Sequence, residues 1–218
     1  MYIEIDNIEL GFGGKQLLNG VYLKAETGKI TAVMGANGCG KSSLLNIIFG
    51  NLDPRHKLIR INSTPHLKPL FTYRGMVKYL PQHSFLPTHL KLSSIFKLYE
   101  VSWDEFTEEF SFFSEYYNSR ITEVSGGERR IAETYLIIKS KAEVLLLDEP
   151  FTHLAPVYIE TFRKILRQEA KQKAVIITDH LYSHIIDLAD ELYFINNGCT
   201  RLIKDPAELE QLNYLTSR

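Results

Sequence analysis

The strongest constraint on the fold is a glycine-rich run that joins an apolar strand pattern to a helical one. Residues 35–42 read Gly-Ala-Asn-Gly-Cys-Gly-Lys-Ser and fit the pattern G-x-x-x-x-G-K-S/T. Apolar residues from Ile30 to Met34 precede the run, and a helical pattern from Lys41 to Gly50 follows it. Glycines let a loop curve closely around phosphate groups, whose charge is stabilised by backbone N–H groups and the helix N-terminus. The sequence therefore predicts a strand, a phosphate-binding loop and a helix in immediate succession.

The loop supplies most of the candidate nucleotide-binding residues. Lys41 is expected to reach the β- and γ-phosphates, and Ser42 is expected to hold Mg²⁺. The alternative is a glycine-rich turn with a chance Lys-Ser pair, which the flanking strand and helix disfavour. The candidate residues are Gly35, Asn37, Gly38, Cys39, Gly40, Lys41, Ser42 and Ser43.

A second chemical element follows the apolar run from Val144 to Leu147. Asp148 and Glu149 come next, where an acidic side chain at the carboxyl end of a buried strand faces the crevice in which such sheets bind ligands. We expect Asp148 to hold Mg²⁺, and Glu149 to orient the attacking water or take its proton. The alternative is an ordinary turn that happens to contain Glu149.

Strand and helix patterns alternate along the C-terminal half, which favours a mainly parallel sheet. With the glycine-rich loop, this order predicts an α/β fold of the P-loop NTPase (RecA-like) type. A length of 218 residues suits a single domain. The expected elements are a helix from Ser125 to about Lys139, a strand over 144–148, a helix over 156–171, a strand over 174–178, a helix over 181–188 and a strand over 191–195.

Two smaller parts are expected beside the parallel core. Strand patterns over 2–10 and 16–25 predict an N-terminal antiparallel β subdomain, and shorter strands are expected over 58–61 and 76–80. From Lys91 to Asn118 the pattern is helical. We expect residues 83–125 to form a small α-helical lobe, with 1–82 and 126–218 as the catalytic core of one domain.

Four aromatic residues in the expected helical lobe recur at helical spacing. Phe106, Phe110, Phe113 and Tyr117 are separated by four, three and four positions, which places them on one face of a helix. We interpret this stripe as packing.

Composition excludes several classes of protein. The formal net charge is −1 and no long run of Lys and Arg occurs, which disfavours a dedicated nucleic-acid binder. No stretch approaches the ~20 apolar residues that cross a bilayer, and the first residues lack the pattern of a signal peptide. The two cysteines, Cys39 and Cys199, indicate neither a disulfide framework nor a zinc site.

A second phosphate-binding element is expected at Ser125-Gly126-Gly127-Glu128. A Ser and two Gly at a helix start form an anion-binding N-terminus, and its position suggests that it serves a nucleotide other than the one on its own glycine-rich loop. The alternative is a plain Ser N-cap. This element resembles the signature motif of the ATP-binding cassette (ABC) family, and the resemblance covers nearly the whole chain.

The resemblance assigns three further residues. Gln82 in Tyr79-Leu80-Pro81-Gln82 matches the Q-loop glutamine, which implies contact with Mg²⁺ and a link to the helical lobe. His180 matches the switch histidine, which implies a bond to the γ-phosphate, although a lone histidine after a strand is otherwise more often structural. Phe12 resembles the aromatic residue that stacks on adenine, with core packing as the alternative.

Three features depart from the family pattern. Ala155 occupies the position where the family usually carries an Asp in the D-loop, which puts the usual contact across the dimer in doubt. The stretch between Gln82 and Ser125 is short, so the helical lobe is expected to be compact. The glycine turn usual after the first β-rich segment is not evident around Asn62.

The resemblance implies an ATP-hydrolysing subunit of a membrane transporter that uses ATP and Mg²⁺. The catalytic residues would be Glu149, His180, Gln82 and Lys41, with Ser42, Gln82 and Asp148 at the metal. Each ATP would lie between two cassettes, with a second copy of the chain as the expected partner. Integral membrane subunits would hold the protein at the cytoplasmic face, and no nucleic acid is expected.

Two other functions stay open at this point. A soluble ABC ATPase acting on ribosomes or DNA would use the same cassette, but tandem cassettes and long coiled-coil insertions are not evident. A regulatory subunit with poor hydrolysis is suggested by Ala155 and disfavoured by the presence of Glu149, Gln82 and His180.

Overall fold

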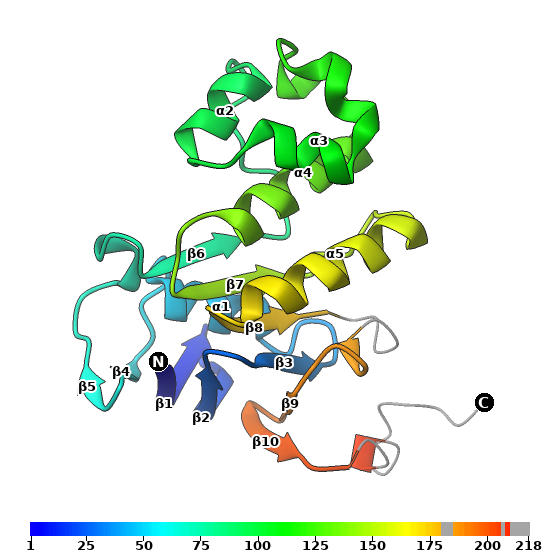
Figure 1. The fold of residues 1–218 in the computed structure, drawn as a ribbon. Coiled ribbons are helices and arrows are strands. Elements are labelled where there is room, and N and C mark those ends of the chain that lie inside the picture. Colours follow the sequence, from blue (N-terminus) through cyan, green and yellow to red (C-terminus); the bar gives the residue numbers. More distant parts are fainter. Residues whose placement is uncertain (180–184, 206–207, 210–218) are drawn as a thin grey trace.

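The centre of the molecule is a six-stranded sheet in the order β10-β9-β3-β8-β7-β6 (Figure 1). The structure is a computed structural model that describes residues 1–179, 185–205 and 208–209. The strands from β9 to β6 are parallel, and β10 is antiparallel to β9. The strands are β3 (Ile30–Gly35), β6 (Val77–Leu80), β7 (Val144–Asp148), β8 (Ala174–Thr178), β9 (Glu191–Asn196) and β10 (Cys199–Ile203).

Strands β7 and β8 are buried on both faces, which explains their continuous apolar sequences. Leu145 and Leu147 pack on one side with the helices α4 (Gly126–Lys139) and α5 (Pro156–Ala170). Val144 and Leu146 pack on the other side with α1 (Lys41–Phe49) and the N-terminal strands.

The helix expected over 181–188 begins at residues outside the described part of the chain. Within that part, no helix is long and apolar enough to span a membrane.

The N-terminal strands form a separate antiparallel sheet in the order β2-β1-β4-β5, as expected for the β subdomain. Its strands are β1 (Tyr2–Phe12), β2 (Lys15–Glu26), β4 (His56–Ile61) and β5 (Thr64–Pro65).

Asn62 and Ser63 form the turn from β4 to β5 with φ of 47° and 67°. Asparagine tolerates this left-handed region better than most residues, so the turn forms without the family's glycine. The Tyr2 backbone N–H also donates to Asn62 Oδ1 at 3.0 Å.

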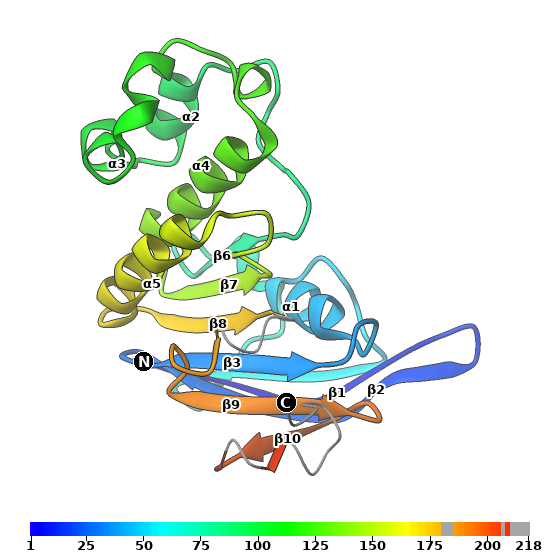
Figure 2. The same ribbon diagram turned by 90° about the vertical axis from the view of Figure 1, so that its right-hand side faces the viewer.

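The expected helical lobe lies at the far end of α4 from β1 and β2 (Figures 1 and 2). It is not one helix. It contains α2 (Leu92–Leu98) and α3 (Trp103–Glu109), followed by 3₁₀ turns at Ser111–Tyr116 and Ile121–Glu123. Outside the lobe, a further 3₁₀ turn at Leu70–Thr72 precedes β6. The chain breaks after α2 at Glu100, whose φ is 56°, and restarts where the Ser102 hydroxyl accepts a hydrogen bond from the Glu105 backbone N–H.

The aromatic residues of the lobe form its core. Phe106, Phe110 and Phe113 are buried, and the Phe106 ring contacts the other two and Tyr135 of α4, which confirms the packing interpretation for these three. Tyr117 is 48% exposed and contacts Trp103 instead. The helical spacing misplaces Tyr117 because the chain leaves helical geometry at Phe110, where φ is −131° and ψ is 70°.

We predict that Phe106→Ala lowers the free energy of unfolding by about 4 kcal/mol, because Phe106 is fully buried and its ring centre lies 4.7 to 4.8 Å from those of Phe96, Phe113 and Tyr135. Urea denaturation measures the change. The matched control is Phe112→Ala, because Phe112 is 37% exposed and should cost about 1 kcal/mol. Equal losses for the two variants would contradict this account of the lobe core.

Candidate nucleotide site

The loop between β3 and α1 depends on its glycines. Gly35 has φ of 154°, and a Cβ there would lie 2.8 Å from the Ile195 carbonyl oxygen. Gly40 has φ of 107°, and a Cβ there would lie 2.7 Å from a methyl carbon of Leu18. Any larger residue at either position would push the loop away from the sheet.

Lys41, the first residue of α1, folds back over this loop. Its Nζ donates to the carbonyl oxygens of Gly35 at 2.7 Å and Ala36 at 3.2 Å, and only 6% of the residue is exposed. These contacts satisfy a buried ammonium group with neutral acceptors. The positive charge is therefore held at the loop, where an anion would meet it.

A cavity of about 430 Å³ brings together several of the candidate residues. The loop forms one wall, and residues from the Q-loop and the end of β7 approach from the other side. The cavity is lined by Leu17, Asn37, Gly38, Gly40, Lys41, Ser42, Ser43, Gln82, Glu149 and Thr152. Gly35 and Cys39 do not line the cavity and support the loop from beneath, with Cys39 half-buried against the core.

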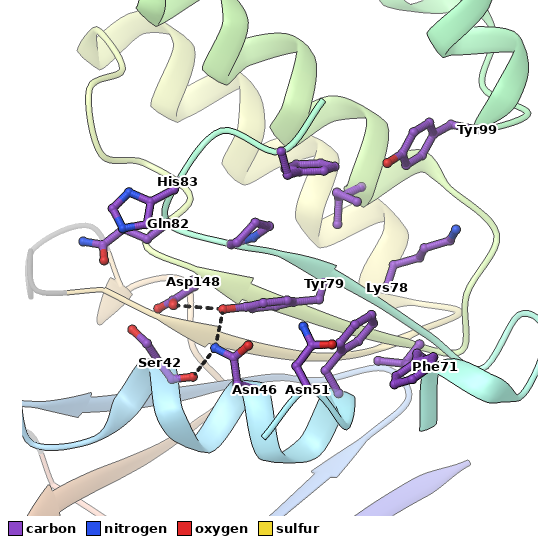
Figure 3. A pocket seen from close by; sticks show the side chains of 15 residues that line it. Ser42, Asn46, Asn51, Phe71, Lys78, Tyr79, Gln82, His83, Tyr99 and Asp148 are labelled. Carbon is purple, nitrogen blue, oxygen red and sulfur yellow. Dashed lines mark hydrogen bonds between the residues drawn. The ribbon is translucent and has the colours of Figure 1, made fainter. Parts of the chain in front are cut away.

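Asp148 is 1% exposed, and a hydroxyl group donates to each of its carboxylate oxygens. Thr178 Oγ1 donates to Oδ1 at 2.6 Å, and the Tyr79 hydroxyl donates to Oδ2 at 3.2 Å (Figure 3). Burial, followed by the charge of Asp148, raises the pKa of Tyr79, so the phenol keeps its proton at neutral pH. Sequence reasoning missed Tyr79; its place three residues before Gln82 was the available signal.

Glu149 has the left-handed φ of 47°, which is strained for a non-glycine residue. This conformation directs its side chain into the cavity, where Gln82 Nε2 donates to its Oε2 at 2.9 Å. Thr152 Oγ1 lies 3.4 Å from the same oxygen. Gln82 and Glu149 are thus in direct contact across the cavity.

Arg130 of α4 ties together the backbone around Gln82 and Glu149. Its guanidinium donates to the carbonyl oxygens of Pro81 at 2.8 Å, Asp148 at 3.0 Å and Glu149 at 2.9 Å. Burial lowers the pKa of Arg130, against the opposing charges of nearby carboxylates. Sequence reasoning missed Arg130. The available signal was its position shortly after Gly127.

One turn further along α4, Glu133 binds the other flank of Gln82. Its Oε1 accepts hydrogen bonds from the Ser84 hydroxyl and the Phe85 backbone N–H. Arg130 and Glu133 therefore connect α4 to both sides of the Q-loop.

Ser125, Gly126 and Gly127 lie outside the Lys41 cavity. Ser125 caps α4 through a capping box with Glu128, so the N-cap interpretation of Ser125 holds in the structure. Apart from its chain neighbours and the nearby backbone of α4, no atom of the described residues would lie within 4 Å of a Cβ at Gly126. Ser125 and Gly127 line a separate cavity of about 460 Å³ with His153, Leu154 and Ala155. A single chain therefore presents its two candidate phosphate-binding elements in different places.

Residues 18–152 match the family model described as ABC transporter. The chain belongs to the ABC transporter family. It is 27% identical over 208 residues to the high-affinity branched-chain amino acid transport ATP-binding protein BraG of Pseudomonas aeruginosa, covering 90% of this chain and 89% of that protein. Identity to the taurine import ATP-binding protein TauB of Shigella dysenteriae is 26% over 213 residues, with coverage of 93% and 82%.

The fold also agrees with a solved ATP-binding subunit of an ABC transporter. The two structures share a TM-score of 0.82 at 21% sequence identity, with coverage of 98% of this chain and 94% of that chain. The predicted α/β fold class is therefore confirmed. As an ABC transporter ATP-binding subunit, the chain binds ATP and hydrolyses it.

Two further residues are expected from the ABC family pattern. Phe12 lies apart from the cavity, and His180 falls outside the described residues. Phe12 is at the end of β1 and 57% exposed, so it is not a core residue, and it does not line the Lys41 cavity. Its contact with adenine stays a prediction.

Ala155 is the N-cap residue of α5, where this ABC subunit departs from the family's D-loop pattern. The cap has no side-chain hydrogen bond, and Pro156 follows at the first helical position. An Asp here would accept a hydrogen bond from an otherwise unpaired N–H of the first turn. With alanine at this position, α5 therefore has no side-chain cap.

We predict that Ala155→Asp raises the free energy of unfolding by about 1 kcal/mol, because it supplies the missing cap of α5. Thermal or urea denaturation of the monomer measures the gain. Ala155→Asn is the control: it caps the helix equally well without adding a charge. A gain with Asp alone would assign the effect to the helix dipole, and no gain with either residue would contradict the capping account.

Proposed function

We propose that two copies of this subunit form a dimer in which each ATP lies between Lys41 of one copy and Ser125–Gly127 of the other. The separation of these elements within one chain carries the proposal, because each is an anion-binding helix start and only a second molecule can bring them together. ATP closes the dimer in this scheme. Loss of the γ-phosphate removes the bridge and lets the dimer open.

The residues around Ser42 fit Mg²⁺ beside the phosphates. Ser42, Gln82 and Asp148 offer a hydroxyl, an amide and a carboxylate oxygen, which are the hard ligands that Mg²⁺ prefers. Ser42 and Asp148 come from α1 and β7, so they approach one point from two sides (Figure 3). When bound, Mg²⁺ neutralises charge on the β- and γ-phosphates. Lys41 adds the second positive charge once it leaves the loop carbonyls for phosphate oxygens.

Glu149 is the general base in this proposal. It lies in the cavity with Lys41, and its Oε2 already accepts a hydrogen bond from Gln82. A water at the position of the Gln82 amide would donate to the same oxygen and attack the γ-phosphate, with Glu149 taking the proton. Gln82 thus both holds the carboxylate in place and marks where the water binds. His180 is proposed to bond the γ-phosphate, and Phe12 to stack on adenine.

A groove of about 630 Å³ is the proposed docking site for a membrane subunit (Figure 3). It lies between α1, β6 and the start of the helical lobe, and Phe49, Phe71 and Phe85 contribute apolar surface. We assign residues 1–82 and 126–218 to the catalytic core and 83–125 to the helical lobe. The relatives' names describe transport and import proteins, which supports work with membrane subunits at the cytoplasmic face.

We predict that Glu149→Gln lowers kcat by at least about 100-fold while the Kd for ATP changes less than about threefold, because the variant loses the base and keeps the phosphate loop. Steady phosphate release and calorimetric titration measure the two quantities. Glu143→Gln is the control, since Glu143 is exposed before the other end of β7. Normal turnover in Glu149→Gln would refute the assigned role.

A mixing experiment tests the shared site. Lys41→Ala and Gly126→Asp should each abolish turnover, the second because a carboxylate would repel the γ-phosphate of the partner copy. The structure has room for the side chain at Gly126, so the fold should tolerate it. In a mixed dimer one site carries both defects and the other carries none.

Mixing the two inactive variants should therefore restore up to about one quarter of the wild-type rate, from half of the dimers with one intact site each. Gly126→Ala, which adds bulk without charge, measures the steric effect alone. No recovery on mixing, with both variants folded and able to exchange subunits, would exclude a site shared between two copies.

A further inference from the structure

Tyr79 connects the docking groove to the carboxylate proposed to bind Mg²⁺. Its ring lies in the wall of the groove, 5.5 Å from the ring of Phe49, and its hydroxyl points to Asp148 (Figure 3). The side chain comes from β6, which pairs in parallel with β7. The strand register thus fixes the distance between Tyr79 and Asp148.

The hydroxyl of Tyr79 is the middle of a directed relay of hydrogen bonds. Asn46 Nδ2 donates to the Tyr79 oxygen at 3.1 Å, and the Tyr79 hydroxyl donates to Asp148 Oδ2 at 3.2 Å. Asn46 Nδ2 also donates to the Ser42 carbonyl oxygen at 2.8 Å, so both of its hydrogens are used. Because Asn46 occupies the phenol oxygen from one side, the phenol proton is directed to Asp148.

The relay joins the two elements that carry the proposed metal ligands. Ser42 and Asn46 lie one turn apart on α1, and Asp148 ends β7. Thr178 donates to the other carboxylate oxygen, so Tyr79 and Thr178 together fix the rotation of the carboxylate. Among the described residues each oxygen accepts from one side-chain donor, which leaves a lone pair on each for a further partner.

We propose that Tyr79 is a positioning residue, held by Asn46, that orients the Asp148 carboxylate for Mg²⁺ bound with ATP. The inference rests on the proposed role of Asp148 at the metal. Partners that hold a metal ligand through hydrogen bonds typically change metal affinity by about 10- to 100-fold when removed. Tyr79 does not touch the nucleotide in this scheme, so its contribution appears only when the metal is present.

The test compares the Kd of a non-hydrolysable ATP analogue in Mg²⁺ and in EDTA by calorimetry, because the ratio of the two isolates the metal's contribution. Tyr79→Phe keeps the ring and removes the hydroxyl. We expect the Mg²⁺-dependent gain in affinity to fall about tenfold, with the Kd in EDTA unchanged. An unchanged gain, or an equal loss of affinity in Mg²⁺ and in EDTA, would overturn the proposal.

Matched variants separate this inference from the proposed function. Tyr99→Phe removes another phenol oxygen of the same groove and should keep the wild-type ratio. Asp148→Asn should lose most of the Mg²⁺ effect. If Asp148→Asn keeps it, the metal role of Asp148 is wrong; if Asp148→Asn loses it and Tyr79→Phe keeps it, only the Tyr79 proposal fails.

A second variant covers the case in which Tyr79→Phe is unstable, as judged by its melting temperature. Asn46→Ala leaves the phenol in place and removes the donor that orients it, on a half-buried helix position that favours alanine. The Mg²⁺-dependent gain should again fall, by less than in Tyr79→Phe. A wild-type ratio in Asn46→Ala would then overturn the relay.

Discussion

The site depends on the burial of β3, β8 and β7 on both faces, which leaves their carboxyl ends as the place where polar groups gather. Parallel pairing brings Gly35, Thr178 and Asp148 to one edge of the sheet, and the register sets Thr178 directly opposite Asp148. A carboxylate at this depth is costly unless hydrogen bonds satisfy it. The hydroxyls of Thr178 and Tyr79 meet that requirement and, in doing so, fix where the carboxylate points.

A second constraint, made by Arg130, links the carboxyl ends of these strands to α4, whose start a partner molecule would contact in the proposed dimer. The guanidinium of Arg130 binds three carbonyl oxygens on two separate segments, so the backbone at Pro81 and at Asp148–Glu149 cannot shift independently of α4. The same helix begins at Ser125. In the proposed dimer, a displacement of the Ser125 end by the second copy would be transmitted along α4 to the backbone around Glu149, since closely packed elements transmit strain.

Short patterns pointed to the parts of the candidate site that lie close together in sequence. The glycine-rich loop and the acidic end of β7 could be read directly because each is a few residues long and has a local backbone requirement. Tyr79 and Arg130 could not, because their contacts with Asp148 depend on strand register and on how α4 packs. The prediction from aromatic spacing was wrong at Tyr117 for a related reason. The spacing assumes an unbroken helix, whereas the chain leaves helical geometry at Phe110.

In the cavity, Lys41 and Glu149 are both held by hydrogen bonds within the chain, and the strength of these bonds bears on how ligand binding can rearrange them. Lys41 is held by two neutral carbonyl oxygens, whereas a phosphate offers charged acceptors that bind an ammonium more strongly. The exchange of carbonyl for phosphate is therefore favourable for Lys41. Glu149 accepts hydrogen bonds from the Gln82 amide and the Thr152 hydroxyl, and in the proposed scheme a water molecule would offer a comparable neutral hydrogen bond in place of the amide. In the proposed scheme the phosphate loop would thus supply the driving force for binding, and the Gln82–Glu149 contact would give way to a water once the nucleotide is in place.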